Sequence, residues 1–359
     1  MNNEHLPTPE TTPSQPAETT VRSPANLALK GVVDVQLVAR LVGKGAINDT
    51  EGKWGVSGTD LGSMFDKDGK VYLVFGDTFG CCIPGTGGPG DAKDWRNSAM
   101  AITSDRIPQD GLTFDEMLTD KPGHAKQLLP KNPSDVTVIP TNGIAIGNRM
   151  ILHYMAVKSW GDPGMWTLNE AGLATSEDDG QTWVKDTPVK WPGDSNFGQV
   201  AFVKDDHYLY LFGIPGGRFG GAKLARVSQE QVLDPSKYEY FAGLEGEMQH
   251  WAAEENTGML VVPPPVGELS VMWNGYLQRW IMTYLDDQLN RLVIRAAPAL
   301  WGPWGPAILL VSHPSYPGLY GAYLHPWLIK NDGETIYFTM SQWGPYAVFL
   351  MKVCLQRSE

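Results

Sequence analysis

The chain has 359 residues, of which 42% are hydrophobic and only 19% are charged, while glycine (40), proline (27) and tryptophan (13) are abundant. This composition indicates many short strands and turns rather than helices, and the net charge of −12 argues against a nucleic-acid partner, which requires a basic surface. No run approaches the roughly 18 apolar residues of a membrane span, and the first residues lack the basic and apolar regions of a secretion signal.

The first segment has an unusual composition. Residues 1–30 are rich in proline, threonine, glutamate and serine and contain almost no large apolar side chain. Such a segment cannot bury enough apolar surface to offset the entropy of folding, so we expect a disordered tail. Residues 31–359 are expected to form one domain.

A β-hairpin is predicted over residues 58–79. Asp68-Gly69 is a strong signal for a type I′ turn, and the β-branched and aromatic run that follows is typical of a strand. With these two residues as the loop, Asp60 falls opposite Asp77, and opposed residues share a face with Cβ atoms about 4.5–5.5 Å apart. Like charges in such a pair repel each other, so the pair is a candidate for acid–base chemistry with one raised pKa. The alternative is that one aspartate binds backbone amides and the other faces solvent.

Two adjacent cysteines, Cys81 and Cys82, follow the hairpin. Three cysteines are too few for a disulfide scaffold. We expect partly buried, inert thiols here rather than a reactive pair.

Five repeated units follow one another from Val32 onward. Each contains a strand, a tight turn, a second strand and a third strand, and this pattern is typical of the blades of a β-propeller. The fold class predicted is therefore all-β, a five-bladed β-propeller preceded by a disordered tail. The expected second strands cover residues 70–77, 149–156, 207–214, 279–286 and 334–342, and the expected third strands cover 98–104, 171–176, 221–227, 291–298 and 346–355.

One local motif supports this fold independently. Residues 176–183 match Ser-x-Asp-x-Gly-x-Thr-Trp, the Asp box of sialidase-like propellers. Asp178 and Gly180 would form the turn, with the Asp178 side chain bonded to backbone amides, and Trp183 would pack between sheets. We expect this motif to be structural.

A propeller arranges its innermost strands around a central channel, and one channel mouth is the usual ligand site. Asp60 and Asp77 are expected at one mouth, together with residues at corresponding positions of the other blades. These are Asn142, His153, Phe197, Gln199, Glu268, Asp286, Tyr320, Tyr323 and His325. The histidines lack the short spacing of zinc ligands, so no metal site is predicted.

The residues around the two aspartates resemble a known family. Gly58-Thr59-Asp60-Leu61-Gly62 and Val74-Phe75-Gly76-Asp77-Thr78-Phe79, with Gly318-Leu319-Tyr320-Gly321 and His325-Pro326 near the end, are similar to the DUF4185 family. That family is now placed among glycoside hydrolases as family 183, the endo-D-arabinanases. The resemblance covers the chain from about Val32 to the end. It implies a five-bladed propeller that cuts the D-arabinofuranose chains of mycobacterial arabinogalactan and lipoarabinomannan, with Asp60 and Asp77 as the catalytic pair.

Glycoside hydrolysis uses two carboxyl groups of this kind. One carboxyl protonates the leaving oxygen while the other attacks or activates water, and no cofactor or metal is needed. Carboxyl groups about 5–5.5 Å apart would give retention and about 6.5–9.5 Å inversion; because the register fixes only the Cβ atoms, the stereochemistry and the two roles stay open. A third carboxylate, Glu170, Glu254 or Asp286, could also serve as the acid.

Aromatic rings are expected to bind the apolar faces of sugars. Candidates are Trp54, Trp95, Trp166, Phe197, Trp251, Tyr320 and Tyr323, with Asn142, His153, Gln199, Tyr320 and His325 bound to sugar hydroxyls. Trp95 and Trp166 lie in long loops containing glycine and proline, where ligand contacts concentrate. The alternative is that most tryptophans wedge between blades.

Two other functions stay open. One is a glycan-binding propeller without catalysis, such as a phage or cell-surface adhesion module, and the other is a hydrolase of another furanoside such as L-arabinan or fructan. In each case the partner is a polysaccharide. We expect a monomer that acts outside the cell or at its surface, although no export signal is visible.

Overall fold

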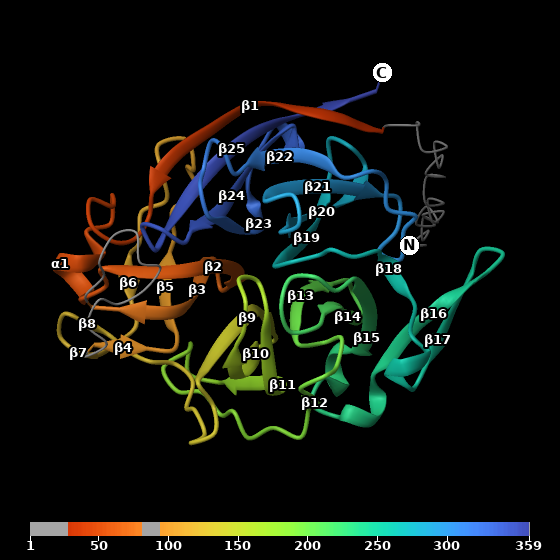
Figure 1. The fold of residues 1–359 in the computed structure, drawn as a ribbon, viewed down its shortest axis with the longest axis horizontal. Coiled ribbons are helices and arrows are strands. Elements are labelled where there is room, and N and C mark those ends of the chain that lie inside the picture. Colours follow the sequence, from red (N-terminus) through yellow and green to blue (C-terminus); the bar gives the residue numbers. More distant parts are fainter. Residues whose placement is uncertain (1–27, 81–93, 359) are drawn as a thin grey trace, which may run out of the picture.

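The protein is an all-β, five-bladed β-propeller, as predicted. The computed structural model describes residues 28–80 and 94–358. Five sheets surround a central axis, and their innermost strands contact one another in turn to close a ring (Figure 1). Cys81 and Cys82 lie outside the described residues, as does the predicted tail up to residue 27.

The first two blades follow the chain directly. Blade one contains β2 (Gly58–Lys67), β3 (Lys70–Phe79), β5 (Ala99–Thr103) and β6 (Glu116–Met117), with β4 (Trp95–Arg96) paired to β3. Blade two contains β9 (Thr137–Ile146), β10 (Arg149–Trp160), β11 (Trp166–Ser176) and β12 (Lys190–Pro192). Before and between them lie the short helix α1 (Thr50–Trp54) and the two-stranded sheet of β7 (Thr119–Lys121) and β8 (His124–Ala125).

The next two blades complete the middle of the chain. Blade three contains β13 (Gln199–Lys204), β14 (Tyr208–Ile214) and β15 (Ala222–Ser228), extended by β16 (Glu239–Glu245), β17 (Met248–Ala252) and β18 (Leu260–Val262). Blade four contains β19 (Leu269–Asn274), β20 (Arg279–Asp286), β21 (Arg291–Ala297) and β22 (Ile308–Ser312). Short 3₁₀ turns cover Gln229–Gln231, Pro235–Lys237, Glu255–Thr257 and Asn331–Gly333.

Blade five joins both ends of the described chain. It contains β23 (Leu319–Lys330), β24 (Thr335–Gln342) and β25 (Ala347–Arg357), and its outermost strand is β1 (Leu29–Arg40). β1 pairs antiparallel with β25, so the first strand closes the ring (Figure 1). The sequence placed the start of the domain at residue 31 and did not predict this closure; β1 begins two residues earlier, at Leu29.

The first hairpin has the predicted turn and an unpredicted distortion. Asp68 and Gly69 have φ values of 48° and 79°, as a type I′ turn requires, and Lys67 pairs with Lys70. Thr59 pairs with Thr78 as expected, but the register shifts on both sides of Leu61, whose φ is 64°. Asp60 therefore lies beside the distortion rather than in a regular pair with Asp77, and such irregularities re-aim side chains.

The Asp box is structural. Asp178 Oδ1 accepts a 2.8 Å hydrogen bond from the Thr182 backbone N–H, and Asp178 Oδ2 accepts one of 2.6 Å from the Thr182 hydroxyl. Trp183 is buried among side chains of blades one and two, including Tyr72 and Met150. The motif thus fixes a turn and places a tryptophan between two sheets, as predicted.

Candidate active site

A cavity of about 320 Å³ lies at the channel mouth where the innermost strands begin. Blade one contributes Asp60 and Asp77, which the hairpin register predicted at one site. The other four blades contribute the remaining polar side chains. The other charged or aromatic lining residues are Phe79, Trp160, Asp162, Trp166, Arg218, Glu268, Tyr320, Trp343 and Tyr346.

Asp60 is held in a setting that favours its protonated form. Burial and, after it, the negative charge of Asp77 raise the pKa of the Asp60 carboxyl to about 7. The Tyr320 hydroxyl opposes this by donating a 3.0 Å hydrogen bond to Asp60 Oδ2. Asp60 Oδ1 has no hydrogen-bond partner among the described residues. The carboxyl can therefore carry a proton near neutral pH.

Asp77 is better stabilised as an anion. Burial raises the pKa of its carboxyl to about 6, while hydrogen bonds from Thr137 and Trp95 act in the opposite direction. The Thr137 hydroxyl donates to Asp77 Oδ1 at 2.6 Å and the Trp95 indole N–H donates to the same oxygen at 3.0 Å. Because both donors bind Oδ1, Asp77 Oδ2 is available to a ligand.

Gly76 makes room for the Asp60 carboxyl. A Cβ atom on Gly76 would lie 2.4 Å from Asp60 Oδ1, closer than atoms can approach without a shift. Its φ value is not positive, so the requirement for glycine here is steric rather than conformational. This gives a physical reason for the glycine directly before Asp77.

A buried ion pair forms another wall of the cavity. Arg218 donates from Nε and Nη2 to Glu268 Oε1, at 2.9 and 2.7 Å. Its guanidinium also lies 4.8 Å from the centre of the Tyr320 ring and 5.6 Å from that of Trp166. Glu268 Oε2 is buried and has no partner in the described part of the chain. Glu268 and the exposed Asp162, rather than Glu170, Glu254 or Asp286, are thus the further carboxylates that line this cavity.

Exposed tryptophans flank the cavity. Trp160 at the end of β10 is 51% exposed, and Trp343 between β24 and β25 is 52% exposed. The rings of Trp160 and Trp166 meet edge to face, with centroids 5.9 Å apart. Blades two and five, which carry Trp160 and Trp343, adjoin blade one on its two sides. Trp160 and Trp343 were not predicted from the sequence. Trp160 ends a blade's second strand and Trp343 directly follows one, and Asp77 lies near the end of the second strand of blade one.

The structure brings only part of the predicted set together. Tyr320 and Trp166 line the cavity, and Trp95 donates a hydrogen bond to Asp77. Tyr323 is buried nearby, where burial and then the negative charges of Glu268 and Asp60 raise the pKa of its hydroxyl. Several others do not line it. His153, Phe197 and Gln199 are buried inside the blades, and Asn142 and His325 lie at the opposite mouth. Trp54 on α1 and Trp251 on β17 are partly buried and pack against the core.

His153 and Gln199 illustrate why those predictions fail. His153 is fully buried, with Nδ1 2.8 Å from the Thr141 hydroxyl and Nε2 3.1 Å from the Phe197 carbonyl, and burial lowers its pKa to about 3. The Gln199 amide donates to the Gly217 carbonyl at 2.9 Å. Both side chains are already satisfied by the protein and stabilise blade contacts.

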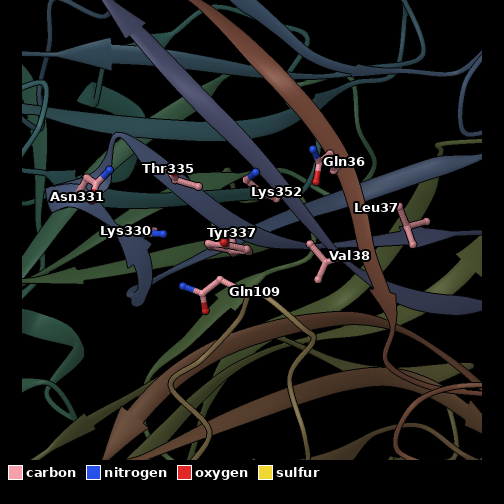
Figure 2. Close-up of a pocket in the computed structure, with 9 residues that line it drawn as sticks. All are labelled: Gln36, Leu37, Val38, Gln109, Lys330, Asn331, Thr335, Tyr337 and Lys352. Carbon is pink, nitrogen blue, oxygen red and sulfur yellow. The ribbon is translucent and has the colours of Figure 1, made fainter.

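Another cavity lies at the outer edge of the propeller. It has a volume of about 390 Å³ and is lined by side chains from β1, β23, β24 and β25 together with Gln109 and Asn331 (Figure 2). Its lining includes Lys330 and Lys352 and no carboxylate. It therefore lacks the acid and base that hydrolysis requires.

Residues 28–80 and 94–358 contain neither a cluster of metal ligands nor a helix that could span a membrane. No group of three or more histidine, cysteine, aspartate or glutamate side chains is arranged to hold a metal ion there. In the same residues no helix has the length and apolar character to cross a membrane.

The sequence matches one family model over most of its length. The model, described as a domain of unknown function (DUF4185), covers residues 45–352. Notoamide biosynthesis cluster protein J from Aspergillus sp. (strain MF297-2) is 27% identical over 329 residues, which is 85% of this chain and 84% of that protein. Notoamide biosynthesis cluster protein J′ from Aspergillus versicolor is 28% identical over 327 residues, 85% of each chain.

Solved structures share the fold at low identity. A protein proposed to be a hydrolase, from Bacteroides ovatus, has a TM-score of 0.60 and 13% identity over 95% of this chain and 97% of its own. A family 117 glycoside hydrolase from Zobellia galactanivorans has a TM-score of 0.52 and 11% identity over 90% of each chain. A GH43_1 enzyme from Xanthomonas citri has a TM-score of 0.50 and 15% identity over 82% of this chain and 86% of its own.

Proposed function

Because the chain belongs to the DUF4185 family, we propose that it is a glycoside hydrolase that cleaves D-arabinofuranosyl linkages within D-arabinan. The observation that carries this proposal is the pairing of Asp60 and Asp77 in one solvent-connected cavity, with both pKa values raised. Two neighbouring carboxyls, of which one keeps its proton more readily than the other, can divide the roles of acid and base. The same fold occurs in a family 117 glycoside hydrolase.

The hydrogen bonds favour one division of roles. Asp60 has the higher pKa, so it would protonate the leaving oxygen. Asp77 accepts from Thr137 and Trp95, which stabilise its anion, so it would activate water or attack the anomeric carbon. In either case the proton given by Asp60 goes to the leaving sugar and the water oxygen ends on the anomeric carbon. Retention or inversion is not assigned.

The lining of the cavity favours an uncharged, extended substrate. Among the described residues that line it, Arg218 is the one basic side chain, and it is already paired with Glu268. An anionic glycan would therefore meet carboxylates without a free cation. Trp160 and Trp343 offer exposed rings on both sides of the aspartates, and rings bind the apolar faces of sugars. A chain bound across both rings would be cut internally.

The choice of D-arabinan rests on the motifs at residues 58–62 and 74–79 and on their resemblance to endo-D-arabinanases. The curated relatives are named for a notoamide biosynthesis cluster, and those names mention no glycan. Substrate identity is therefore the part of the proposal that needs the broadest assay. L-arabinan and fructan are the comparison substrates.

Two isosteric variants test the proposal. Asp60→Asn and Asp77→Asn should each lower the release of reducing ends from purified D-arabinan by about 10²–10⁴-fold, as expected for the loss of a general acid or base. The exposed Asp206→Asn is the matched control, because its side chain lies on a turn of blade three. Full activity of both active-site variants would refute the proposal. Retained binding of arabinan without any reducing ends from the wild-type protein would instead favour a glycan-binding propeller.

A further inference from the structure

A second cavity, of about 280 Å³, lies at the opposite channel mouth, where the innermost strands end. All five blades contribute to it, through β2, β9, β13, β19 and β23. Its volume is near the lower end of the range for small-molecule sites. Because Asp60 and Asp77 do not line it, it is separate from the catalytic cavity.

One wall of this second cavity is aromatic. Trp273 on β19 is 44% exposed, and its ring meets that of Trp280 on β20 at a centroid distance of 5.5 Å and an angle of 74°. Leaving a large indole surface in water is unfavourable unless a ligand covers it. Two perpendicular rings offer one flat face and one edge to a small ligand.

Hydrogen-bonding groups from three other positions line the same cavity. Asn142 Oδ1 accepts from the Phe202 backbone N–H at 3.2 Å, which leaves the Asn142 amide N–H groups for a ligand. The Ser270 hydroxyl oxygen accepts from the Leu324 N–H at 3.0 Å, so its own proton is free to rotate.

His325 supplies the third group and shows that the site is built. The side chain is 2% exposed, and its Nδ1 accepts from the Trp327 backbone N–H at 3.2 Å, so Nε2 carries the proton when the ring is neutral. Nε2 is buried without a hydrogen-bond partner among the described residues, and Asp66 Oδ1 lies 3.5 Å away, which is too long for a strong bond. A buried donor of this kind is costly unless a ligand or water meets it.

Asp66 adds an acceptor at the rim. Its contact with His325 lowers the pKa of the Asp66 carboxyl, so this group is ionised at neutral pH. Lys204 lines the cavity as well, but its ammonium group donates to the Ala145 carbonyl at 2.9 Å. Neutral donors, one carboxylate and aromatic surface together match a polyhydroxyl ligand and disfavour an anion.

We propose that this opposite mouth binds one sugar unit of a neutral glycan without cleaving it. The sugar would stack on Trp273, donate a hydroxyl proton to Asp66, and accept hydrogen bonds from Asn142 and His325. Such a site would hold a long polysaccharide on the protein while another part of the same or a neighbouring chain is cut. The site is independent of the proposed hydrolysis, because none of its residues lines the catalytic cavity.

The test follows the indole N–H signals of ¹⁵N-tryptophan-labelled protein during titration with methyl α-D-arabinofuranoside, methyl α-L-arabinofuranoside and methyl β-D-xylopyranoside. Signals of Trp273 and Trp280, assigned with Trp273→Phe and Trp280→Phe, should shift and saturate at millimolar concentrations of at least one glycoside. Trp273→Ala and Asn142→Asp should each weaken this binding at least tenfold, and Trp273→Phe should retain most of it.

Controls separate this site from the catalytic one. Trp160→Ala should leave the shifts of Trp273 and Trp280 unchanged, and Trp273→Ala should leave hydrolysis of a short soluble substrate unchanged while slowing the degradation of insoluble polysaccharide. The proposal is overturned if none of the three glycosides moves the Trp273 or Trp280 signal at 100 mM, or if Trp273→Ala binds them as well as the wild-type protein does. Either result can be read whether or not Asp60 and Asp77 prove catalytic.

Discussion

The Tyr320 hydroxyl donates a 3.0 Å hydrogen bond to Asp60 Oδ2 and so connects two residues 260 positions apart in the chain. Tyr320 begins blade five and Asp60 begins blade one, and these blades are neighbours only because the ring closes. The pKa of Asp60, which burial and Asp77 raise, is therefore lowered in part by a residue of the last blade.

Removal of this hydrogen bond should move the alkaline limb of the pH–activity profile upward. In the proposed mechanism Asp60 is protonated and Asp77 ionised in the active form, so the wild-type kcat/KM should be bell-shaped with limbs near pH 6 and 7. Tyr320 lowers the pKa of Asp60, so Tyr320→Phe should raise the alkaline limb by about 0.5–1 unit. A profile measured with Tyr208→Phe, on the outer part of blade three, serves as control. An alkaline limb that stays in place in Tyr320→Phe would mean that Asp60 is not the acid.

Glu268→Gln should have the opposite effect. The Glu268 charge raises the pKa of Asp60, so its neutralisation should shift the alkaline limb of kcat/KM to lower pH, by less than one unit because Glu268 is the weakest of the causes acting on Asp60. The glutamine oxygen can still accept from Arg218, which keeps the wall of the cavity. A shift to higher pH would contradict this placement of the Glu268 charge. Thermal unfolding of the same variant shows whether the loss of the buried ion pair costs stability.

Gly76→Ala should reduce activity without unfolding the blade. The new Cβ would lie 2.4 Å from Asp60 Oδ1, so the carboxyl must move, and a displacement of about 1 Å can cost about 10²-fold in rate. The measurement is kcat on a soluble arabino-oligosaccharide, with circular dichroism to monitor the fold. Gly31→Ala is the comparison, because its Cβ would meet only the end of the Gln356 side chain. Wild-type kcat in Gly76→Ala would show that Asp60 need not hold this position.

Asp60→Asn should stabilise the protein at high pH. The pKa of Asp60 rises from 3.8 to about 7 on folding, so its protonated form favours the folded state, and that contribution is lost as pH rises from about 4 to about 7. Asparagine does not ionise, so the variant does not lose stability in this way as the pH rises. The difference in Tm between variant and wild type should be small at pH 4, grow to several degrees by pH 7 and then level off, as differential scanning calorimetry would show.

The same scan provides its own control. Asp206 is exposed, so Asp206→Asn should show no comparable dependence on pH. A Tm difference for Asp60→Asn that is constant from pH 4 to pH 8 would indicate that the Asp60 carboxyl keeps an ordinary pKa in the folded protein.

The blades could be predicted from the sequence because their signals are local. Turn residues such as Asp68-Gly69 fix a hairpin and its register within a few residues, and the five second strands of the structure begin within one residue of the expected positions. The Asp box likewise makes all its defining hydrogen bonds inside one turn. Closure of the ring by β1 was missed, because pairing with β25 depends on residues more than 300 positions away.

Part of the site could also be predicted because its signals are local. Asp60 and Asp77 share one hairpin, so the turn brings them together, although the distortion at Leu61 was not foreseen. Asn142 and His325 were misplaced because they lie several residues further along their strands, and the two ends of an inner strand open on opposite mouths. His153 and Phe197 were misassigned because no local pattern distinguishes a packed ring from one that awaits a ligand.

The pairing of β1 with β25 also orders events during translation. The hairpin that carries both aspartates is synthesised early, but the tyrosine that tunes Asp60 belongs to the last blade, and that blade is complete only when residues 347–357 have left the ribosome and joined residues 29–40. A nascent chain would therefore carry its acidic pair for most of its synthesis before Asp60 acquires its final environment. Activity should begin late and abruptly, as the propeller closes.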